Sequence, residues 1–185
     1  NFKFDLFDHF DIFINMKYAL KYFLYILLVA IIIRVFFIDT FSVKGDSMTP
    51  AINDGDYVVI NRLAYLFSEP KRGDIIVVIP RGLNKKIIKR VIGLPGERIV
   101  FDKDAIAIKE SREDKGKILE EKYVNGGTTK GNGKMFYETI DPMEYFVLGD
   151  NRDVSVDSRE LGGIDRWGIK GKVVKIIRGI KEINV

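Results

Sequence analysis

The segment KIIKRVIGLPGERIVFD, residues 86–102, contains two runs rich in isoleucine and valine, separated by a Leu-Pro-Gly turn. β-Branched residues favour strands, and proline and glycine favour the turns between them. Similar runs recur along the chain: DYVVI at 56–60, DIIVVI at 74–79, AIAI at 105–108, EYFVLGD at 144–150 and KGKVVKII at 170–177. Because helical patterns of about 10–15 residues do not alternate with these runs, the sequence predicts a mainly β domain built on an antiparallel sheet.

The region from Asp102 to Pro142 interrupts this pattern with a polar and charged composition. It includes KESREDKGKILEEK at 109–122 and NGGTTKGNGK at 125–134, and the stronger runs RIVF and YFVLGD stand on either side. We therefore expect a small β cap inserted into the main domain at about 102–142.

Residues 18–38 form the most hydrophobic segment, interrupted only by Lys21 and Arg34. A helix of this length spans about 30 Å, the thickness of the hydrocarbon core of a bilayer. A buried core helix is one alternative, but such helices rarely carry an uninterrupted apolar run like Phe23–Ile33. A cleaved secretory signal is another, although no small-x-small cleavage site follows the segment. We predict one transmembrane helix that is retained as an anchor.

The hydrophobic segment divides the chain into three parts. We expect an N-terminal segment at 1–17, the transmembrane helix at 18–38 and a β domain at 39–185. Lys17 and Lys21 flank the start of the helix and favour a cytoplasmic N-terminus. The sequence therefore predicts a single-pass protein of the cell membrane whose β domain is extracytoplasmic.

The composition excludes several kinds of site. The chain has no cysteine, one histidine and a formal net charge of +4. Disulfides, thiolate metal sites and cysteine catalysis are therefore excluded, and a transition-metal site would lack ligands. Charges of both signs are mixed along the chain without a long Lys/Arg block, which disfavours a nucleic-acid partner. We expect neither a cofactor nor a bound metal.

Ser47 lies in the stretch VKGDSMTP, residues 43–50, shortly after the hydrophobic segment. A serine hydroxyl is a weak nucleophile and needs a base to activate it. The chain's histidine, His9, precedes the hydrophobic segment, so a His-based triad is disfavoured. A buried lysine is the other base available near neutral pH, because desolvation lowers the pKa of its amine.

Lys89 is the lysine whose surroundings suit this role best. In a strand over residues 86–92, alternation places it on one face with Ile87 and Val91, whose apolar side chains would exclude water. Arg90 has similar neighbours, but a guanidinium stays charged and cannot act as a base. The alternative is that Lys89 lies on a solvent-facing edge strand.

The stretch GDNRDVSVDSR, residues 149–159, follows a hydrophobic run and is dense in Asp, Asn, Ser and Arg. Such a loop can hold carboxylate–guanidinium pairs and place a hydroxyl near an active site. Taken alone, it could equally be a surface turn or a cation-binding loop.

Together, these segments resemble the type I signal peptidases, membrane-anchored Ser/Lys proteases that remove signal peptides from exported proteins. GDSMTPAINDGDYVVINR resembles the serine box of that family, and KRVIGLPGE its lysine box. RGDIIVV, GDNRDVSVDSRELGGI and IKGKVV resemble three further family segments, in the family's order. Gly45 stands where part of the family has a serine, and the cap is short, which is similar to the compact Gram-positive-type enzymes.

The resemblance implies a role for each matched position. Ser47 matches the nucleophile, Lys89 the general base, and Ser155 the serine that hydrogen-bonds the lysine amine. Four charged residues match positions that brace the site through salt bridges: Asp150, Arg152, Asp157 and Arg159. The oxyanion hole would rest on the Ser47 backbone N–H, with Gly45 as the candidate second donor. The substrate pockets would be shaped by Val43, Met48 and Ile88.

The function implied by the resemblance is a membrane-anchored serine endopeptidase. Its substrates would be the signal peptides of secreted preproteins with Ala-x-Ala sites, and its other partners the lipid bilayer and the secretion translocon. Two other classes share part of the pattern. A self-cleaving repressor-type Ser/Lys protease would carry a DNA-binding domain where the hydrophobic segment stands. A non-catalytic membrane-anchored β domain would have a decayed site, which the intact Ser47, Lys89 and Ser155 disfavour.

The apolar stretch LAYLF, residues 63–67, lies in a connecting region without clear alternation. It either packs into the core or forms a surface that enters the outer leaflet of the membrane.

Overall fold

The computed structural model describes residues 4–102, 105–124, 135–137 and 139–179. The helical elements are α1 (Phe4–Phe37), α2 (Ser158–Leu161) and a 3-10 turn at Arg166–Gly168. The strands are β1 (Ile38–Ser42), β2 (Tyr57–Asn61), β3 (Ile75–Val78), β4 (Ile87–Gly93), β5 (Arg98–Asp102), β6 (Ala105–Lys109), β7 (Lys117–Ile118), β8 (Met135–Tyr137), β9 (Glu144–Leu148), β10 (Ile164–Asp165) and β11 (Ile169–Ile177). The mainly β class predicted from the sequence is confirmed.

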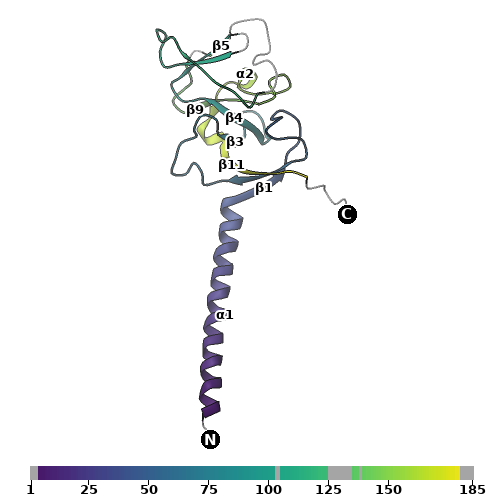
Figure 1. Ribbon diagram of the computed structural model, residues 1–185. Coiled ribbons are helices and arrows are strands. Elements are labelled where there is room, and N and C mark those ends of the chain that lie inside the picture. Colours follow the sequence, from purple (N-terminus) through teal and green to yellow (C-terminus); the bar gives the residue numbers. More distant parts are fainter. Residues whose placement is uncertain (1–3, 103–104, 125–134, 138, 180–185) are drawn as a thin grey trace. The chain divides into compact units, whose positions relative to one another are not determined.

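The larger sheet contains seven strands in the order β1-β2-β11-β3-β4-β9-β10. The strand pairs from β2 to β10 are antiparallel, as predicted. β4 lies between β3 and β9, with Ile76 opposite Lys89 and Leu148 opposite Arg90 (Figure 1). Lys89 is therefore inside the sheet and not on a solvent-facing edge.

Both faces of β4 are covered by the core. Ile87 and Val91 pack in one apolar cluster with Tyr145 and Val147, whereas Ile88 packs in a second cluster that includes Met48. Alternation from the sequence separates these two sets of side chains correctly. It does not reveal that both faces are packed against other parts of the domain.

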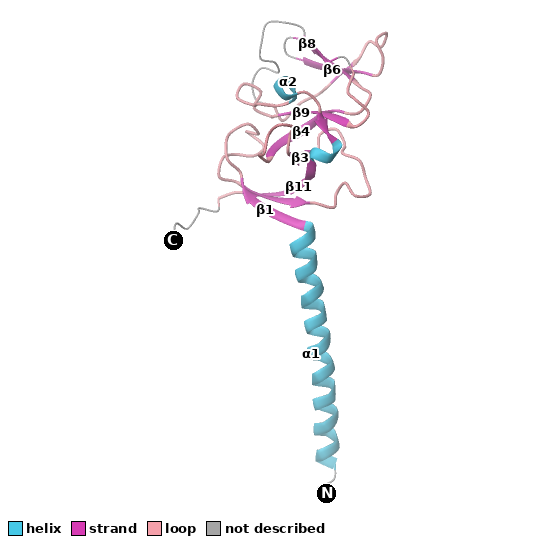
Figure 2. Cartoon of the chain, turned by 180° about the vertical axis from the view of Figure 1, so that it is seen from behind, coloured by secondary structure: helices cyan, strands magenta, loops and turns pink. Residues whose placement is uncertain are grey.

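The smaller sheet has four strands in the order β7-β6-β5-β8. It lies at the end of the β domain opposite β11 (Figure 2). Phe101 and Ile106 of this sheet pack against Phe146 and Leu148 of β9, which joins the two sheets through one core. β6, β7 and β8 of this sheet fall within the predicted cap at about 102–142, whereas β5 precedes it. Residues 103–104, 125–134 and 138 of that region lie outside the described residues.

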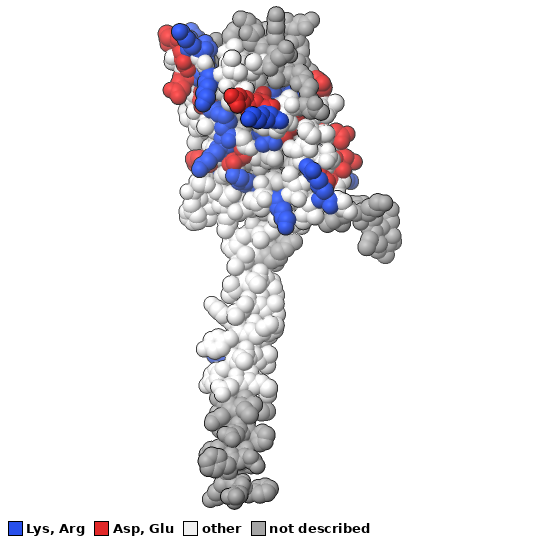
Figure 3. All heavy atoms as spheres, viewed as in Figure 1, with Lys and Arg blue, Asp and Glu red and all other residues white. Residues whose placement is uncertain are grey.

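The helix α1 belongs to a compact unit of its own, and the β domain begins at Thr40. Asn15–Ile33 is long and apolar enough to cross a membrane, and its side chains are exposed. Figure 3 shows the described surface of the helix almost without charge, whereas the β domain carries both signs. This window starts and ends a few residues before the predicted span at 18–38. The helix has the length and composition of a membrane span.

Candidate active site

Ser47 is presented by a tight turn between β1 and β2. Gly45 adopts a φ of 94°, a conformation that favours glycine, and thus turns the chain ahead of the serine. Met48, next to Ser47, is almost fully buried in the core. The Ser47 carbonyl oxygen accepts a hydrogen bond from the Asn151 N–H at 3.1 Å. The buried Met48 and the Asn151 N–H therefore both hold the half-buried serine in place.

The Lys89 amine reaches Ser47 from β4. Lys89 Nζ lies 2.7 Å from Ser47 Oγ, and the lysine is only 3% exposed. Burial lowers the pKa of Lys89 to about 8. The carboxylates of Asp157 and Asp150 oppose this shift, while the positive charges of Arg159 and Lys85 add to it. The arrangement places a hydroxyl beside an amine that can lose its proton near neutral pH.

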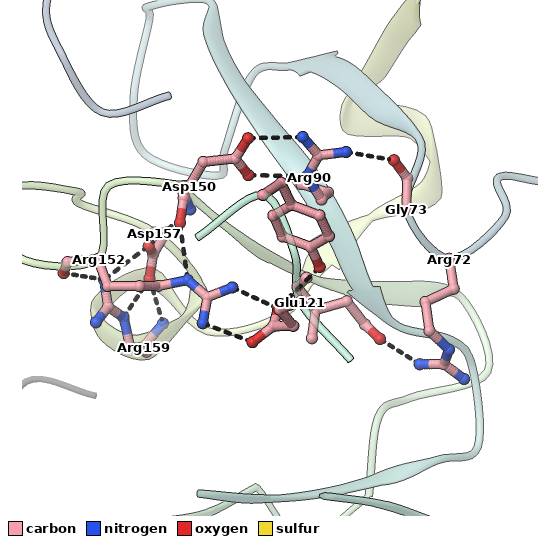
Figure 4. Close-up of polar contacts among 11 residues, drawn as sticks. Arg72, Gly73, Arg90, Glu121, Asp150, Arg152, Asp157 and Arg159 are labelled. Carbon is pink, nitrogen blue, oxygen red and sulfur yellow. Dashed lines mark hydrogen bonds and ion pairs between the residues drawn. The ribbon is translucent and has the colours of Figure 1, made fainter. Parts of the chain in front are cut away.

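Two buried ion pairs hold β4 and the loop at 149–159 around Ser47 and Lys89. Arg90, adjacent to Lys89, donates to both carboxylate oxygens of Asp150 at 2.8 and 2.6 Å. Asp157 pairs with Arg159 at 2.8 Å and accepts the Gly149 N–H at 3.0 Å. Although burial opposes its ionisation, hydrogen bonds from Arg159 hold the pKa of Asp157 below its usual value. Figure 4 shows both pairs.

Arg152 is the fourth of the charged residues singled out in the sequence. It donates to the Gly149 carbonyl oxygen at 2.9 Å and forms a two-pronged ion pair with Glu121 (Figure 4). Asp150, Arg152, Asp157 and Arg159 thus make three ion pairs in this structure. Two of these join the loop to Arg90 and to Glu121, and the third, Asp157 with Arg159, lies within one turn.

Ser155 is buried beside the site, but its hydroxyl does not make the expected hydrogen bond with the Lys89 amine. Within the described residues, Ser155 Oγ makes no hydrogen bond, so the predicted bond to the Lys89 amine is not formed in this structure. The hydroxyl lies close enough to the Asp157 carboxylate to help lower its pKa, without the geometry of a hydrogen bond. Its backbone N–H donates to the Asn151 carbonyl oxygen at 3.1 Å.

The two candidate oxyanion donors differ in availability. The Gly45 N–H donates to Asp54 Oδ1 at 2.6 Å, so in this conformation it is not free to bind a substrate oxyanion. The Ser47 N–H has no hydrogen-bond acceptor in the part of the chain that the structure describes. Only the Ser47 donor therefore has the freedom that the prediction requires.

A cleft of about 610 Å³ opens over Ser47 and Lys89. Val43, Met48 and Ile88, the predicted pocket residues, line it with apolar side chains. Lysines stand on its rim at Lys44, Lys85 and Lys86. The cleft is large enough for several residues of an extended peptide, and its lining combines apolar side chains with Ser47 and Lys89.

A comparison of the sequence with protein families gives a match that includes the apolar helix and the β domain. The profile described as "Signal peptidase, peptidase S26" matches residues 16–177. The chain belongs to this signal peptidase family. Signal peptidase IB of Staphylococcus aureus (strain N315) is 32% identical over 151 residues, which cover 77% of this chain and 78% of the relative. Signal peptidase I of Bacillus licheniformis is 31% identical over 157 residues, covering 84% of each chain.

A crystal structure of a signal peptidase I from Enterococcus faecalis V583 is also similar. It is 29% identical, with a TM-score of 0.49, and the match covers 57% of this chain and 97% of that chain.

Several residues of the candidate site make contacts that the sequence does not reveal. Gly149 has no room for a Cβ atom, which would come within 2.4 Å of the Ser47 carbonyl oxygen. Glu121 and Tyr123 approach the site from the smaller sheet, and Arg90 stacks 3.9 Å from the Tyr123 ring. Gly149 stands in a recognisable motif, but no local pattern marks Glu121 or Tyr123.

Proposed function

We propose that this signal peptidase cleaves preproteins with Ser47 as the nucleophile and neutral Lys89 as the general base. The observation that carries the proposal is the 2.7 Å contact between Lys89 Nζ and Ser47 Oγ in a site where the amine is buried. A serine needs a base within hydrogen-bond reach, and a lysine can serve only if its pKa is lowered. Both conditions are met by the same pair of residues.

The proposed reaction proceeds through an acyl-enzyme. Lys89 takes the Ser47 proton as Oγ attacks the scissile carbonyl carbon, and the oxyanion is stabilised by the Ser47 N–H. The protonated Lys89 then gives its proton to the leaving amine, which departs as the new N-terminus of the mature protein. Lys89 next removes a proton from water, which attacks the ester, and the proton returns to Ser47 as the signal peptide leaves.

Substrate binding in this proposal uses the strand edge near Val43–Ser47. An extended signal-peptide end would add its backbone to this edge, since main-chain hydrogen bonds do not depend on side-chain identity. Val43, Met48 and Ile88 give the cleft an apolar lining that supports selection of small side chains, such as the alanines of an Ala-x-Ala site.

The proposed function predicts that Ser47→Ala abolishes cleavage. The measurement is the release of a signal peptide from a preprotein with an Ala-x-Ala site, by full-length wild type and variant in detergent. Removing Oγ eliminates the nucleophile while leaving the turn intact, so the variant should fold normally and cleave at background rate. Thr49→Ser, which keeps its hydroxyl and removes only a methyl group two positions away, serves as the folding control. Cleavage by Ser47→Ala at the wild-type rate would exclude Ser47 as the nucleophile.

For the membrane, we propose that α1 anchors the chain with its N-terminus in the cytoplasm and the β domain outside. An apolar surface of the β domain, formed by Leu66, Phe67 and Trp167, would contact the same bilayer. These side chains are 63%, 92% and 75% exposed, and Leu66 and Trp167 line one shallow groove. In contrast, Tyr65 and Ala64 of the LAYLF stretch pack with the core. Tryptophan and phenylalanine favour the interface between water and lipid.

Trp167 is the one tryptophan of the chain and so reports directly on this surface. In full-length protein reconstituted in vesicles, lipids with brominated acyl chains should quench its fluorescence, because bromine quenches only at contact. Leu66→Ser combined with Phe67→Ser should reduce the quenching. Ile118→Ser, an equally exposed aliphatic change on β7, should not. Wild-type fluorescence that is the same with and without bromine would contradict lipid contact at this surface.

A further inference from the structure

A short segment that follows β7 of the smaller sheet, Glu121–Tyr123, contacts the arginines that brace the proposed catalytic site. It follows β7 and faces two buried arginines of the larger sheet and its loop. The Glu121 carboxylate binds Arg152 through two contacts, Oε1 to Nη2 at 2.5 Å and Oε2 to Nη1 at 3.1 Å. The Tyr123 hydroxyl donates to the same carboxylate at 2.8 Å. Figure 4 shows Glu121 facing the Arg152 guanidinium.

This ion pair is withdrawn from water. The Arg152 side chain is 1% exposed and that of Glu121 is 4% exposed. Removing one partner of a buried ion pair is far more damaging than the loss of a surface pair. The position of Arg152 therefore depends on Glu121.

Arg152 in turn holds the loop that contacts the catalytic serine. Its Nε donates to the Gly149 carbonyl oxygen at 2.9 Å. Gly149 lies against the Ser47 carbonyl oxygen so closely that a Cβ atom would not fit, and the Asn151 N–H donates to that oxygen. A displacement of Arg152 would thus be transmitted to the Ser47 peptide through two residues.

Tyr123 provides a second route, toward the lysine. Arg90 lies 3.9 Å from the centre of the Tyr123 ring, within the range of a cation–π contact. Arg90 directly follows Lys89 on β4 and is held by Asp150 on its other side. The segment therefore touches both the loop behind Ser47 and the strand that carries Lys89.

We propose that Glu121 is a positioning residue, which keeps Ser47 and Lys89 within hydrogen-bond distance of each other. It does so by holding Arg152 and, together with Tyr123, the side chain of Arg90. The proposal rests on the proposed function, because it concerns the same nucleophile and base. It links the smaller sheet to the catalytic apparatus, since the segment after β7 supplies a buried carboxylate to Arg152.

The test compares Glu121→Gln with Glu120→Gln in full-length protein, using a preprotein substrate and active-site titration to count folded enzyme. Glu120 is the exposed neighbour and carries the same change without touching the site. Glu121→Gln should lower kcat per active site by roughly 10- to 100-fold, because small misplacements of reacting groups are costly, with little change in KM. Glu120→Gln should match wild type in both constants.

The pH profile separates positioning from mere structural support. Loosening the site lets water reach the Lys89 amine, so the acidic limb of kcat/KM should move to higher pH in Glu121→Gln. The charged groups around that amine, Asp157, Asp150, Arg159 and Lys85, are unchanged by the substitution. If Glu121 served only global stability, titrated enzyme would keep the wild-type kcat and the wild-type limb, and this result would overturn the proposal.

Two further variants complete the test. If Glu121 acts mainly through Arg152, the losses from Glu121→Gln and Arg152→Gln should combine to much less than their sum, whereas fully additive losses would contradict the proposed route. If Glu121→Gln does not yield folded protein, Tyr123→Phe is used in its place, because it removes only the hydroxyl bond to Glu121. This variant should lower kcat and move the acidic limb of kcat/KM to higher pH. Unchanged kcat and limb in Tyr123→Phe would then overturn the proposal. Failure of wild type itself to cleave would instead contradict the proposed function.

Discussion

Lys89→Met should lose signal-peptide cleavage by roughly 10³-fold or more while keeping its fold. Methionine has a similar length and fits an apolar site, but it cannot accept the Ser47 proton. Without a base the serine hydroxyl stays protonated and its attack on the carbonyl is very slow. Single-turnover cleavage of a preprotein by titrated, full-length enzyme measures the loss.

Stability distinguishes loss of chemistry from loss of fold in this variant. Because the pKa of Lys89 is about 8 in the folded protein, below that of an exposed lysine, the folded state binds this proton less tightly than the unfolded state. The buried amine therefore opposes folding increasingly as the pH falls from about 10 toward 8, and fully below that. Lys89→Met should consequently be at least as stable as wild type at pH 7, as measured by thermal unfolding.

Lys175→Met is the matched control for Lys89→Met. Lys175 is an exposed lysine on β11, remote from the cleft lining, so its replacement should leave cleavage unchanged. Near-normal cleavage by Lys89→Met would show that another group is the base. Equal losses in both variants would point to a general effect of removing a lysine.

Gly149→Ala should be the most damaging small substitution outside the two reacting residues. The added Cβ would lie 2.4 Å from the Ser47 carbonyl oxygen and 2.2 Å from Ser155 Oγ, far inside contact distance. Since the first of these atoms is backbone, a side-chain rotation cannot relieve the clash. We expect destabilisation by about 1–3 kcal/mol and a fall in kcat of roughly 100-fold, because Ser47 is displaced from Lys89.

Thermal unfolding and titrated kcat together test this expectation. Asp153→Ala, at an exposed position of the same loop, introduces alanine without a clash and should behave like wild type. If Gly149→Ala retained wild-type kcat, the loop would not determine the position of Ser47.

The main strands could be predicted from the sequence because their apolar runs are long enough to show a pattern. The runs at 56–60, 74–79 and 170–177 all became strands of the larger sheet. β7 and β10 contain two residues each, and such short pairings depend on the neighbouring strand more than on their own composition. The order of the strands also could not be derived, because β11 joins β2 and β3 across about a hundred residues of chain.

The candidate site was predictable to the extent that it lies in dense local motifs. Ser47, Lys89 and the loop at 149–159 stood out by their composition, and the structure brings all three together. The sequence could not show that the Gly45 N–H is already occupied, because its acceptor, Asp54, lies nine residues away along the chain. Glu121 was missed since its partner Arg152 lies 31 residues away, and a glutamate in a charged surface run usually remains solvated.

The most direct test of the proposed dyad is the pH dependence of kcat/KM for cleavage of a substrate without groups that titrate in the same range. The neutral amine is required, so the rate should be level above the pKa of Lys89, about 8, and fall below it. On the acidic side the fall should be about tenfold per pH unit, as expected for loss of one essential proton acceptor. A rate that stays constant down to about pH 6 would contradict the central claim that neutral Lys89 activates Ser47.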